Sequence, residues 1–270
     1  MSLFAVVGHT SRDLVDSRPP RAGGAPLYAA RALRVLGEPA LLVTRCAEAD
    51  HALLASLRAL GLPVVWRAEA RTAAFSIRNR DGERALSLAT LGEPWTPEDA
   101  RGWLGEALAE VDWVHAGALW RGDFPAETLA ELRRGRRLSL DGQGLVRPGR
   151  TGPVELAGGL DPAVLAACDL LHLSEPEAAA LGVSLDERSL RSLGVPEVVV
   201  TLGKRGAVVF ADDLAEYVPA RPLARVDPTG AGDAFTAAYV VSRRRGHAPA
   251  SAARVATEVV HGLLSGEVRA

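Results

Sequence analysis

The sequence predicts an α/β fold with a mostly parallel sheet and helices on both of its faces. Short apolar runs rich in Val and Leu alternate with helix-like segments along most of the chain, which is typical of repeated β-α-β units. The runs are apolar throughout, as expected of strands buried on both faces. Between residues 62 and 90 the alternation stops and strand-like stretches follow one another. We therefore expect a single domain, residues 1–270, that carries a smaller β piece.

Local signals place the individual elements of this fold. Residues 3–8 and 41–44 are apolar runs that predict buried strands, and residues 27–36 and 51–60 predict helices that end at Gly37 and Gly61. Later strands are expected at residues 112–115, 137–141, 169–173, 197–201, 208–210 and 216–218. Later helices are expected at residues 96–109, 124–132, 162–167, 176–181, 185–193, 231–244 and 250–264.

Residues 11–20 and 62–90 predict a separate antiparallel β piece. The stretches 64–66, 72–77 and 84–88 have strand composition, and Asp81-Gly82 between the last two is a strong hairpin signal. No helix-like segment intervenes, so we expect these strands to pair with one another and with a weaker strand in 11–20. Periodicity leaves two interpretations open, an ordinary excursion of a mixed sheet or a lid that excludes water from a reaction site.

Composition favours a small-molecule partner. The net charge is −2 and the isoelectric point about 6.3, so we expect neither nucleic acid nor an anionic membrane surface to be bound. Arg12 and Asp13 interrupt the apolar start, and no apolar run approaches the length of a membrane span, so a cytoplasmic location is expected. Cys46 and Cys168 are expected to be reduced core residues.

Residues 227–235, Asp-Pro-Thr-Gly-Ala-Gly-Asp-Ala-Phe, carry the strongest functional signal. Small residues at Gly230, Ala231 and Gly232 let the backbone approach a ligand, and a helix pattern begins right after them. Free amides at a helix start stabilise anions, which makes this loop a candidate phosphate cradle with Asp233 as a proton acceptor beside it. The alternative is a glycine-rich turn in which Asp233 only complements the helix dipole.

The stretch from residue 227 to residue 240 resembles the C-terminal signature of the ribokinase (PfkB) family of carbohydrate kinases, and the resemblance extends over nearly the whole chain. It implies a ribokinase-like fold in which Asp233 is the catalytic base and the amides of Gly230, Ala231 and Gly232 form an anion hole. It also implies ATP and Mg²⁺ as cofactors. In the family a β lid is inserted at about residues 11–20 and 62–90, and lid strands often pair between subunits, so we expect a homodimer.

Residues near the start of the chain match the family's acceptor site. The segment from Gly8 to Asp13 resembles the first motif, whose Asp contacts substrate hydroxyls, and Asp13 matches it. Gly23 and Gly24 match the Gly-Gly that approaches the sugar closely. Tyr28 stands where the family usually has an Asn, so a common sugar contact is lost or replaced, which leaves the identity of the acceptor open.

Donor-site matches lie in the second half of the chain. Thr201, Gly203 and Gly206 match the nucleotide loop Thr-x-Gly-x-x-Gly, and Lys204 within it is a weaker candidate for a phosphate contact. Thr229 matches a position that binds a monovalent cation in some members, together with Asp227, but the C-terminal loop that completes such a site is not recognisable.

The family's Asn-x-x-Glu motif, whose Glu orders water around the metal of Mg·ATP, has only a partial match here. Glu177 matches the Glu, and Ser174 replaces the Asn. Magnesium that is held mainly by phosphates and water needs few protein ligands, so the departure is compatible with metal use.

Residues 140–147 bear on the acceptor. Asp141 ends a strand beside the expected site, Gln143 both donates and accepts hydrogen bonds, and Arg147 carries a charge for a phosphate. This stretch resembles the myo-inositol kinase branch of the family, although that resemblance rests on a few short pieces. The alternative is structural, with Asp-Gly and Gln-Gly forming turns and Arg147 in a surface ion pair.

Several functions therefore stay open at the level of the sequence. The reading favoured here is phosphoryl transfer from ATP to a small polyol or sugar, with myo-inositol as the branch suggests. A nucleoside or sugar acid is the alternative acceptor, and a phosphorylated sugar would need a further cation, for which Arg78, Arg80 and Arg121 are candidates. A ligand-binding regulator without catalysis is the rival from another class, permitted by the departures at Tyr28 and Ser174.

Overall fold

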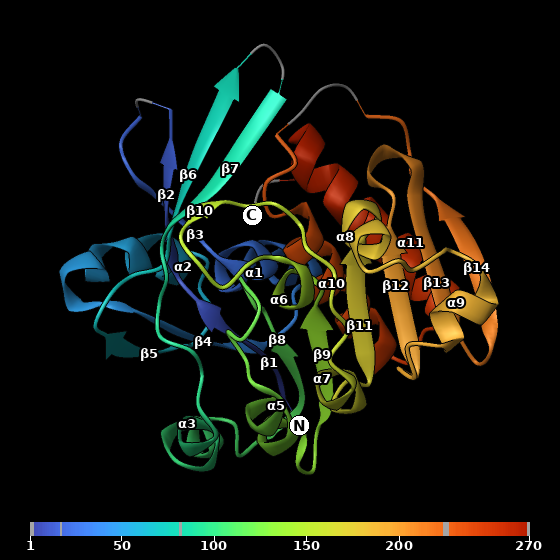
Figure 1. Cartoon of the computed structure of the whole chain (residues 1–270), viewed down its shortest axis with the longest axis horizontal. Coiled ribbons are helices and arrows are strands. Elements are labelled where there is room, and N and C mark those ends of the chain that lie inside the picture. Colours follow the sequence, from blue (N-terminus) through green and yellow to red (C-terminus); the bar gives the residue numbers. More distant parts are fainter. Residues whose placement is uncertain (1–2, 17, 81–82, 224–226, 269–270) are drawn as a thin grey trace.

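The computed structural model describes residues 3–16, 18–80, 83–223 and 227–268. Its main sheet has nine strands that pair in parallel, except at one edge, where the second-last strand along the chain pairs antiparallel with both of its neighbours (Figure 1). In spatial order the strands are β14 (Leu214–Pro219), β13 (Gly206–Ala211), β12 (Glu197–Thr201), β11 (Leu170–Ser174), β9 (Arg137–Asp141), β8 (Val111–Ala116), β1 (Leu3–His9), β4 (Ala40–Ala47) and β5 (Val64–Glu69).

Both faces of this sheet are buried, which explains the uninterrupted apolar runs. In β1, Phe4 and Val6 contribute to one core cluster, whereas Ala5 and Val7 contribute to the cluster on the other face. One face is covered by α1 (Ala25–Leu36), α10 (Ala231–Arg244) and α11 (Pro249–Ser265). The other is covered by α4 (Trp103–Ala107), α5 (Ala126–Arg133), α7 (Pro162–Ala166), α8 (Glu175–Ala180) and α9 (Glu187–Arg191).

A second, five-stranded sheet projects beyond the end of the main sheet (Figure 1). It consists, in spatial order, of β10 (Gly152–Pro153), β7 (Glu83–Thr90), β6 (Ala74–Arg80), β2 (Ser11–Val15) and β3 (Arg21–Gly23). The neighbours β2 and β6 run parallel, and the other neighbouring strands run antiparallel. Its apolar side packs Phe75 and Ile77 against Leu119 and Trp120, which follow β8. The second sheet is thereby fixed to a loop at the carboxyl end of the main sheet.

The structure corrects part of the predicted lid. Residues 64–66 do not join the second sheet, because β5 pairs parallel with β4 at the edge of the main sheet. Val64 pairs with Leu42 and packs on the core shared with α1, a partner that local sequence signals do not reveal. The hairpin expected at Asp81-Gly82 falls on residues outside those described.

Three helical segments differ from the prediction. The helix expected over residues 96–109 is interrupted at Gly102, which separates α3 (Pro97–Arg101) from α4. The helix expected at 51–60 begins as a 3₁₀ segment (η1, Glu48–Leu53) and continues as α2 (Leu54–Arg58). Elsewhere, a short 3₁₀ segment, η2 (Gly203–Arg205), follows β12. A short helix, α6 (Gln143–Val146), forms where turns were expected.

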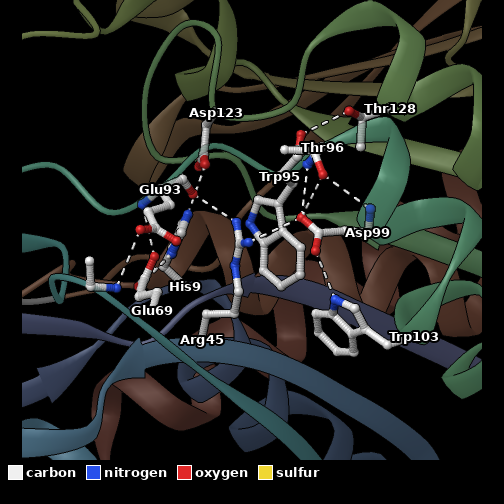
Figure 2. Close-up of polar contacts among 11 residues, drawn as sticks. His9, Arg45, Glu69, Glu93, Trp95, Thr96, Asp99, Trp103, Asp123 and Thr128 are labelled. Carbon is white, nitrogen blue, oxygen red and sulfur yellow. Dashed lines mark hydrogen bonds and ion pairs between the residues drawn. The ribbon is translucent and has the colours of Figure 1, made fainter.

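A buried polar cluster lies at the carboxyl ends of β1, β4 and β5 (Figure 2). Nδ1 of His9 contacts Glu69 at 3.1 Å and Nε2 contacts Asp123 at 2.9 Å, and all three side chains are fully buried. Beside them the Arg45 guanidinium lies over the Trp95 ring and forms an ion pair with Asp99 at 3.2 Å. The cluster ties the end of the first strand to the loop that supports the second sheet. Among the described residues, the helices are all too short or too polar to cross a lipid bilayer.

Candidate active site

A cavity of about 250 Å³ lies between the second sheet and the carboxyl ends of the main strands, and we call it the first cavity. The sequence motifs converge there. Its polar lining includes Asp13, Tyr28, Asp141, Gln143, Arg147, Glu177, Thr201, Thr229, Gly230, Gly232 and Asp233, and its apolar wall includes Phe75, Ile77 and Leu119. Residues more than 200 positions apart therefore share one site, as the resemblance implied.

The first turn of α10 provides the backbone of the expected anion hole. Gly230 is the residue before the helix and has φ 78°, a left-handed conformation that favours glycine. A Cβ on Gly230 would also lie 2.0 Å from Cγ of Tyr28, so the ring packs directly on this loop. The amide of Ala231 donates to the carbonyl of Pro228 within the turn. The amides of Gly232 and Asp233 precede the first bond of the helix, from Ala234 to Gly230, and are the donors that a phosphate can use.

Asp233 lies in this first turn, and its side chain is directed into the protein with only 8% of the residue exposed. Burial, followed by the negative charge of Asp141, raises the pKa of Asp233 well above its usual range, and a hydrogen bond with the Asp141 carboxylate adds to the rise. The positive charge of Arg147 opposes the rise. A carboxyl group with a raised proton affinity at the edge of a cavity suits general base catalysis.

Asp141 is held in an ionised state beneath Asp233. Burial alone would raise its pKa, but the charges and hydrogen bonds of His115 and His172 outweigh burial and place the pKa of Asp141 well below its usual range. Nε2 of His115 donates to Oδ2 at 3.2 Å, and Nδ1 of His172 donates to Oδ1 at 2.9 Å. The hydroxyl of Thr236 donates to Oδ1 as well, at 3.1 Å.

Sequence reasoning missed these two histidines. Each is a polar residue near the end of a mostly apolar strand, His115 in β8 and His172 in β11. That position, at the carboxyl edge of a parallel sheet, is the signal that could have found them.

Asp13 faces the first cavity from β2 and is 4% exposed. Its Oδ1 accepts from the hydroxyl of Ser11 at 2.9 Å, and the Tyr28 hydroxyl lies 3.5 Å from Oδ2. Gly23 and Gly24 are required for this close packing, because a Cβ would lie 2.5 Å from Asp13 Oδ2 and 2.0 Å from the His9 carbonyl oxygen, respectively. Tyr28, which replaces the family's Asn, thus lies between Asp13 and the loop before α10.

Gln143 and Arg147 flank the opposite side of the first cavity, brought there by α6. The Arg147 guanidinium lies over the Phe75 ring at 5.8 Å, which joins this segment to the second sheet. Arg121, a candidate for binding a phosphorylated sugar, instead donates to the backbone carbonyls of Leu145 and Ala157. Its hydrogen bonds support the loop after α6.

A second cavity, of about 360 Å³, lies on the other side of the α10 start. Its polar lining includes Thr201, Gly203, Lys204 and Gly206, and its apolar lining includes Leu223, Phe235, Val260 and Leu264. His261 lines it as well, buried and with both ring nitrogens lacking a hydrogen-bond partner among the described residues. Thr201, Pro228 and Gly232 line both cavities, so the loop before α10 is their shared wall.

Glu177 and Ser174 form a capping box at the start of α8, in which Glu177 Oε2 accepts the Ser174 amide at 2.8 Å. The described residues contain no cluster of three or more His, Cys, Asp or Glu side chains that could hold a metal. The site therefore fits Mg²⁺ only as an ion held chiefly by donor phosphates and water, with Glu177 at the cavity wall.

Asp227, at the expected position for a monovalent cation, contacts other residues of the chain. Asp227 accepts from the amide of Thr229 at 3.0 Å and also from its hydroxyl, and Arg21 of β3 lies 3.6 Å from the other carboxylate oxygen. A guanidinium thus stands close to the carboxylate that a cation would approach.

Comparison with known proteins agrees with this geometry. The family described as pfkB family carbohydrate kinase matches residues 5–260. A solved pyrophosphate-dependent kinase of the ribokinase family, complexed with a pyrophosphate analogue and myo-inositol, is 26% identical with a TM-score of 0.83, covering 98% of this chain and 95% of that one. A ribokinase of Arabidopsis thaliana, complexed with ribose and ATP, is 20% identical with a TM-score of 0.76, covers 100% of this chain and 94% of that one, and shares the fold.

Curated relatives match over shorter stretches. A nucleoside kinase of Methanothermobacter thermautotrophicus is 33% identical over 102 residues, which cover 37% of this chain and 33% of the relative. An inositol 3-kinase of Zea mays is 32% identical over 123 residues, which cover 44% of this chain and 31% of the relative. The chain thus matches about a third of the length of these relatives. The family match over almost its full length, together with the ribokinase-like fold, identifies the chain as a member of the pfkB family of carbohydrate kinases.

Proposed function

We propose that the protein transfers the γ-phosphoryl group of Mg·ATP to a hydroxyl of a small polyol, with myo-inositol as the first candidate. The observation that carries the proposal is the position of the α10 start as the shared wall of two cavities. One cavity is lined by groups suited to hydroxyls and the other has room for a nucleotide. A phosphoryl group that passes from one to the other meets the amides of Gly232 and Asp233 at the wall.

The chemistry at this wall requires a base and an anion hole. Asp233 accepts the proton of the acceptor hydroxyl as its oxygen forms a bond to the γ-phosphorus, and the bond from that phosphorus to the bridging oxygen of ADP breaks. The amides at the start of α10 bind the oxygens of the phosphoryl group in the transition state of its transfer. Mg²⁺, when bound with the donor, neutralises phosphate charge, and Glu177 orients water around it. Thr201, Lys204 and the backbone at Gly203 and Gly206 bind the remaining phosphates.

The acceptor is inferred from the lining of the first cavity. Asp13 can accept hydrogen bonds from two adjacent hydroxyls, whereas Gln143 can both accept and donate. Phe75, Ile77 and Leu119 offer an apolar wall to the C–H groups of a ring. A structural neighbour bound to myo-inositol and the inositol 3-kinase of Zea mays support the same class of acceptor. A nucleoside or sugar acid is the alternative.

Pyrophosphate is the second candidate donor, because several similar structures are of a pyrophosphate-dependent kinase. The apolar walls of the second cavity favour ATP, since a purine base needs such walls and pyrophosphate has no group that would use them. Val260→Trp fills this cavity and distinguishes the donors. If ATP is the donor, we expect this variant to raise KM for ATP at least tenfold. If pyrophosphate is the donor, we expect KM for pyrophosphate to be unchanged.

The test of the reaction is product formation. Purified protein is incubated with Mg²⁺ and either ATP or pyrophosphate, over a panel of myo-inositol, ribose, fructose, nucleosides and 2-keto-3-deoxygluconate, and ³¹P NMR identifies the phosphorylated acceptor. Asp233→Asn should lower kcat by about 10²- to 10⁴-fold and leave the Kd of the donor nearly intact. Asp213→Asn, an exposed carboxylate paired with Arg191, is the control. Unchanged turnover in Asp233→Asn would contradict the assignment of the base.

We further propose that the second sheet acts as the lid of a single domain, that it pairs between two subunits, and that the protein works in the cytoplasm. The lid role rests on the position of Phe75 and Ile77 at the first cavity. Light scattering of the purified protein tests the dimer. A monomer at working concentrations would refute the pairing.

A further inference from the structure

The first turn of α10 rests on side chains from two neighbouring strand ends. Thr236, one turn into the helix, donates to Asp141 Oδ1 at 3.1 Å. The ring of Phe235 stacks on His172, with ring centres 5.8 Å apart and an angle of 21°. A Cβ on Gly232 would lie 3.2 Å from Cε1 of His172. Asp141 and His172 therefore determine where the anion hole and the base lie.

Asp141 was predicted to bind the substrate, but its contacts point to another role. The residue is 1% exposed, and its two oxygens accept from His115, His172 and Thr236. Its negative charge also raises the pKa of the Asp233 carboxyl group. A carboxylate with this many protein partners has little capacity left for acceptor hydroxyls.

We propose that Asp141 is a positioning residue for the base: its carboxylate, held by His115 and His172, anchors the first turn of α10 through Thr236, at the wall of the cavity that Asp233 also lines. This inference rests on the proposed role of Asp233. Asp141 takes no part in bond making, and the proton of the acceptor hydroxyl goes to Asp233 and leaves from there to solvent once the product departs.

The groups that face Asp233 determine in which direction its pKa is shifted. Asp141 of β9, Glu177 of α8 and, across the cavity, Arg147 after α6 and the phenol of Tyr28 in α1 surround it. Of these, Asp141 acts most strongly in raising the pKa of Asp233. Turnover needs the deprotonated form, so the rate should rise with pH as Asp233 loses its proton. A base with higher proton affinity also takes the hydroxyl proton more readily once ionised.

Asp141→Asn tests this role by removing the charge at nearly constant shape. We expect kcat to fall roughly 10- to 100-fold, with KM for the acceptor unchanged. The acid limb of the kcat profile should move to lower pH, because a neighbouring negative charge that raises the pKa of Asp233 is lost. The matched control is Asp123→Asn, another buried carboxylate bonded to a histidine, which should leave the acid limb where it is.

Two outcomes would overturn the inference. A raised KM with an unmoved acid limb would mean that Asp141 touches the acceptor instead. The second outcome is independent of turnover: in wild-type protein labelled with ¹³C at aspartate Cγ, one carboxyl with a raised pKa should be present, and it should be absent in Asp233→Asn. Its absence from the wild type would refute the pairing even if the kinase reaction is confirmed, and wild-type titration needs no folded variant of Asp141.

Discussion

Replacing His9 by Gln removes the positive charge that joins two buried carboxylates. In the wild type, the imidazole bridges Glu69 and Asp123 (Figure 2), and all three side chains are fully buried. The imidazole also stacks on Trp120. Burial alone lowers the pKa of His9. The charge and hydrogen bond of Asp123, followed by those of Glu69, outweigh burial and raise the pKa from 6.5 to about 9. At neutral pH the bridge is therefore an imidazolium between two carboxylates.

The raised pKa sets the size and the direction of the effect on stability. One pKa unit corresponds to about 1.4 kcal/mol, so a rise from 6.5 to about 9 contributes about 3 kcal/mol to the free energy of unfolding. Because the folded-state pKa is the higher one, this contribution is fully present below pH 6.5. It is lost as the pH rises through 9, when the folded protein releases the proton.

The assay is urea unfolding of the wild type and His9→Gln at several values between pH 6 and pH 10. The free energy of unfolding of the wild type should exceed that of the variant most at pH 6. This difference should shrink by about 3 kcal/mol by pH 10. Groups that titrate equally in both proteins cancel in this difference. A difference that stays constant over the range would refute the reasoning, as would an NMR titration of the wild type that places His9 near 6.5.

Three further predictions follow from packing and charge. Gly230→Ala should lower the free energy of unfolding by about 1–3 kcal/mol and remove most of kcat, because the new Cβ meets the Tyr28 ring. Gly246→Ala is the control for backbone strain, because Gly246 also has a positive φ, 86°, but a Cβ there meets open space. Equal losses of kcat in both variants would exclude the clash as the cause. Glu177→Gln keeps an oxygen for the helix cap, so thermal unfolding should hardly change while the Mg²⁺ concentration for half-maximal rate rises; an unchanged requirement would remove Glu177 from the metal shell. Leu129→Ala, fully buried in α5, should lower the free energy of urea unfolding by about 3 kcal/mol and leave KM intact.

Local sequence signals predicted much of the fold because its strands are apolar and several of its helices, such as α1 and α11, end at a glycine. The bounds of β9 and β12 agree with the prediction, as do those of α10. The error at residues 64–66 has a different origin. A strand at the edge of a parallel sheet and a strand of a lid have the same local composition, and the difference lies in the distant partner, here Leu42 of β4. Pairing between remote segments is not encoded in periodicity.

In the candidate site, too, local motifs were predicted from the sequence, whereas contacts between distant segments were not. The motifs at Gly230 to Asp233 and at Asp13 predicted residues that line the first cavity. The environment of Asp141 could not be foreseen, because its meaning depends on His115 and His172 in two other strands. Whether a carboxylate at a strand end binds a ligand or supports another side chain is decided by tertiary contacts.

The place of α10 in the chain has a consequence for synthesis. This helix is buried from Asp233 to Ser242 and packs against both α1 and α11, yet it follows every strand of the main sheet in the chain. On the ribosome, the nascent chain exposes the apolar face of α1 and of the sheet until residues 231–265 have emerged. Asp233, the proposed base, is synthesised with the helices that close the core, so a growing chain gains this residue only when its hydrophobic surface is about to be covered.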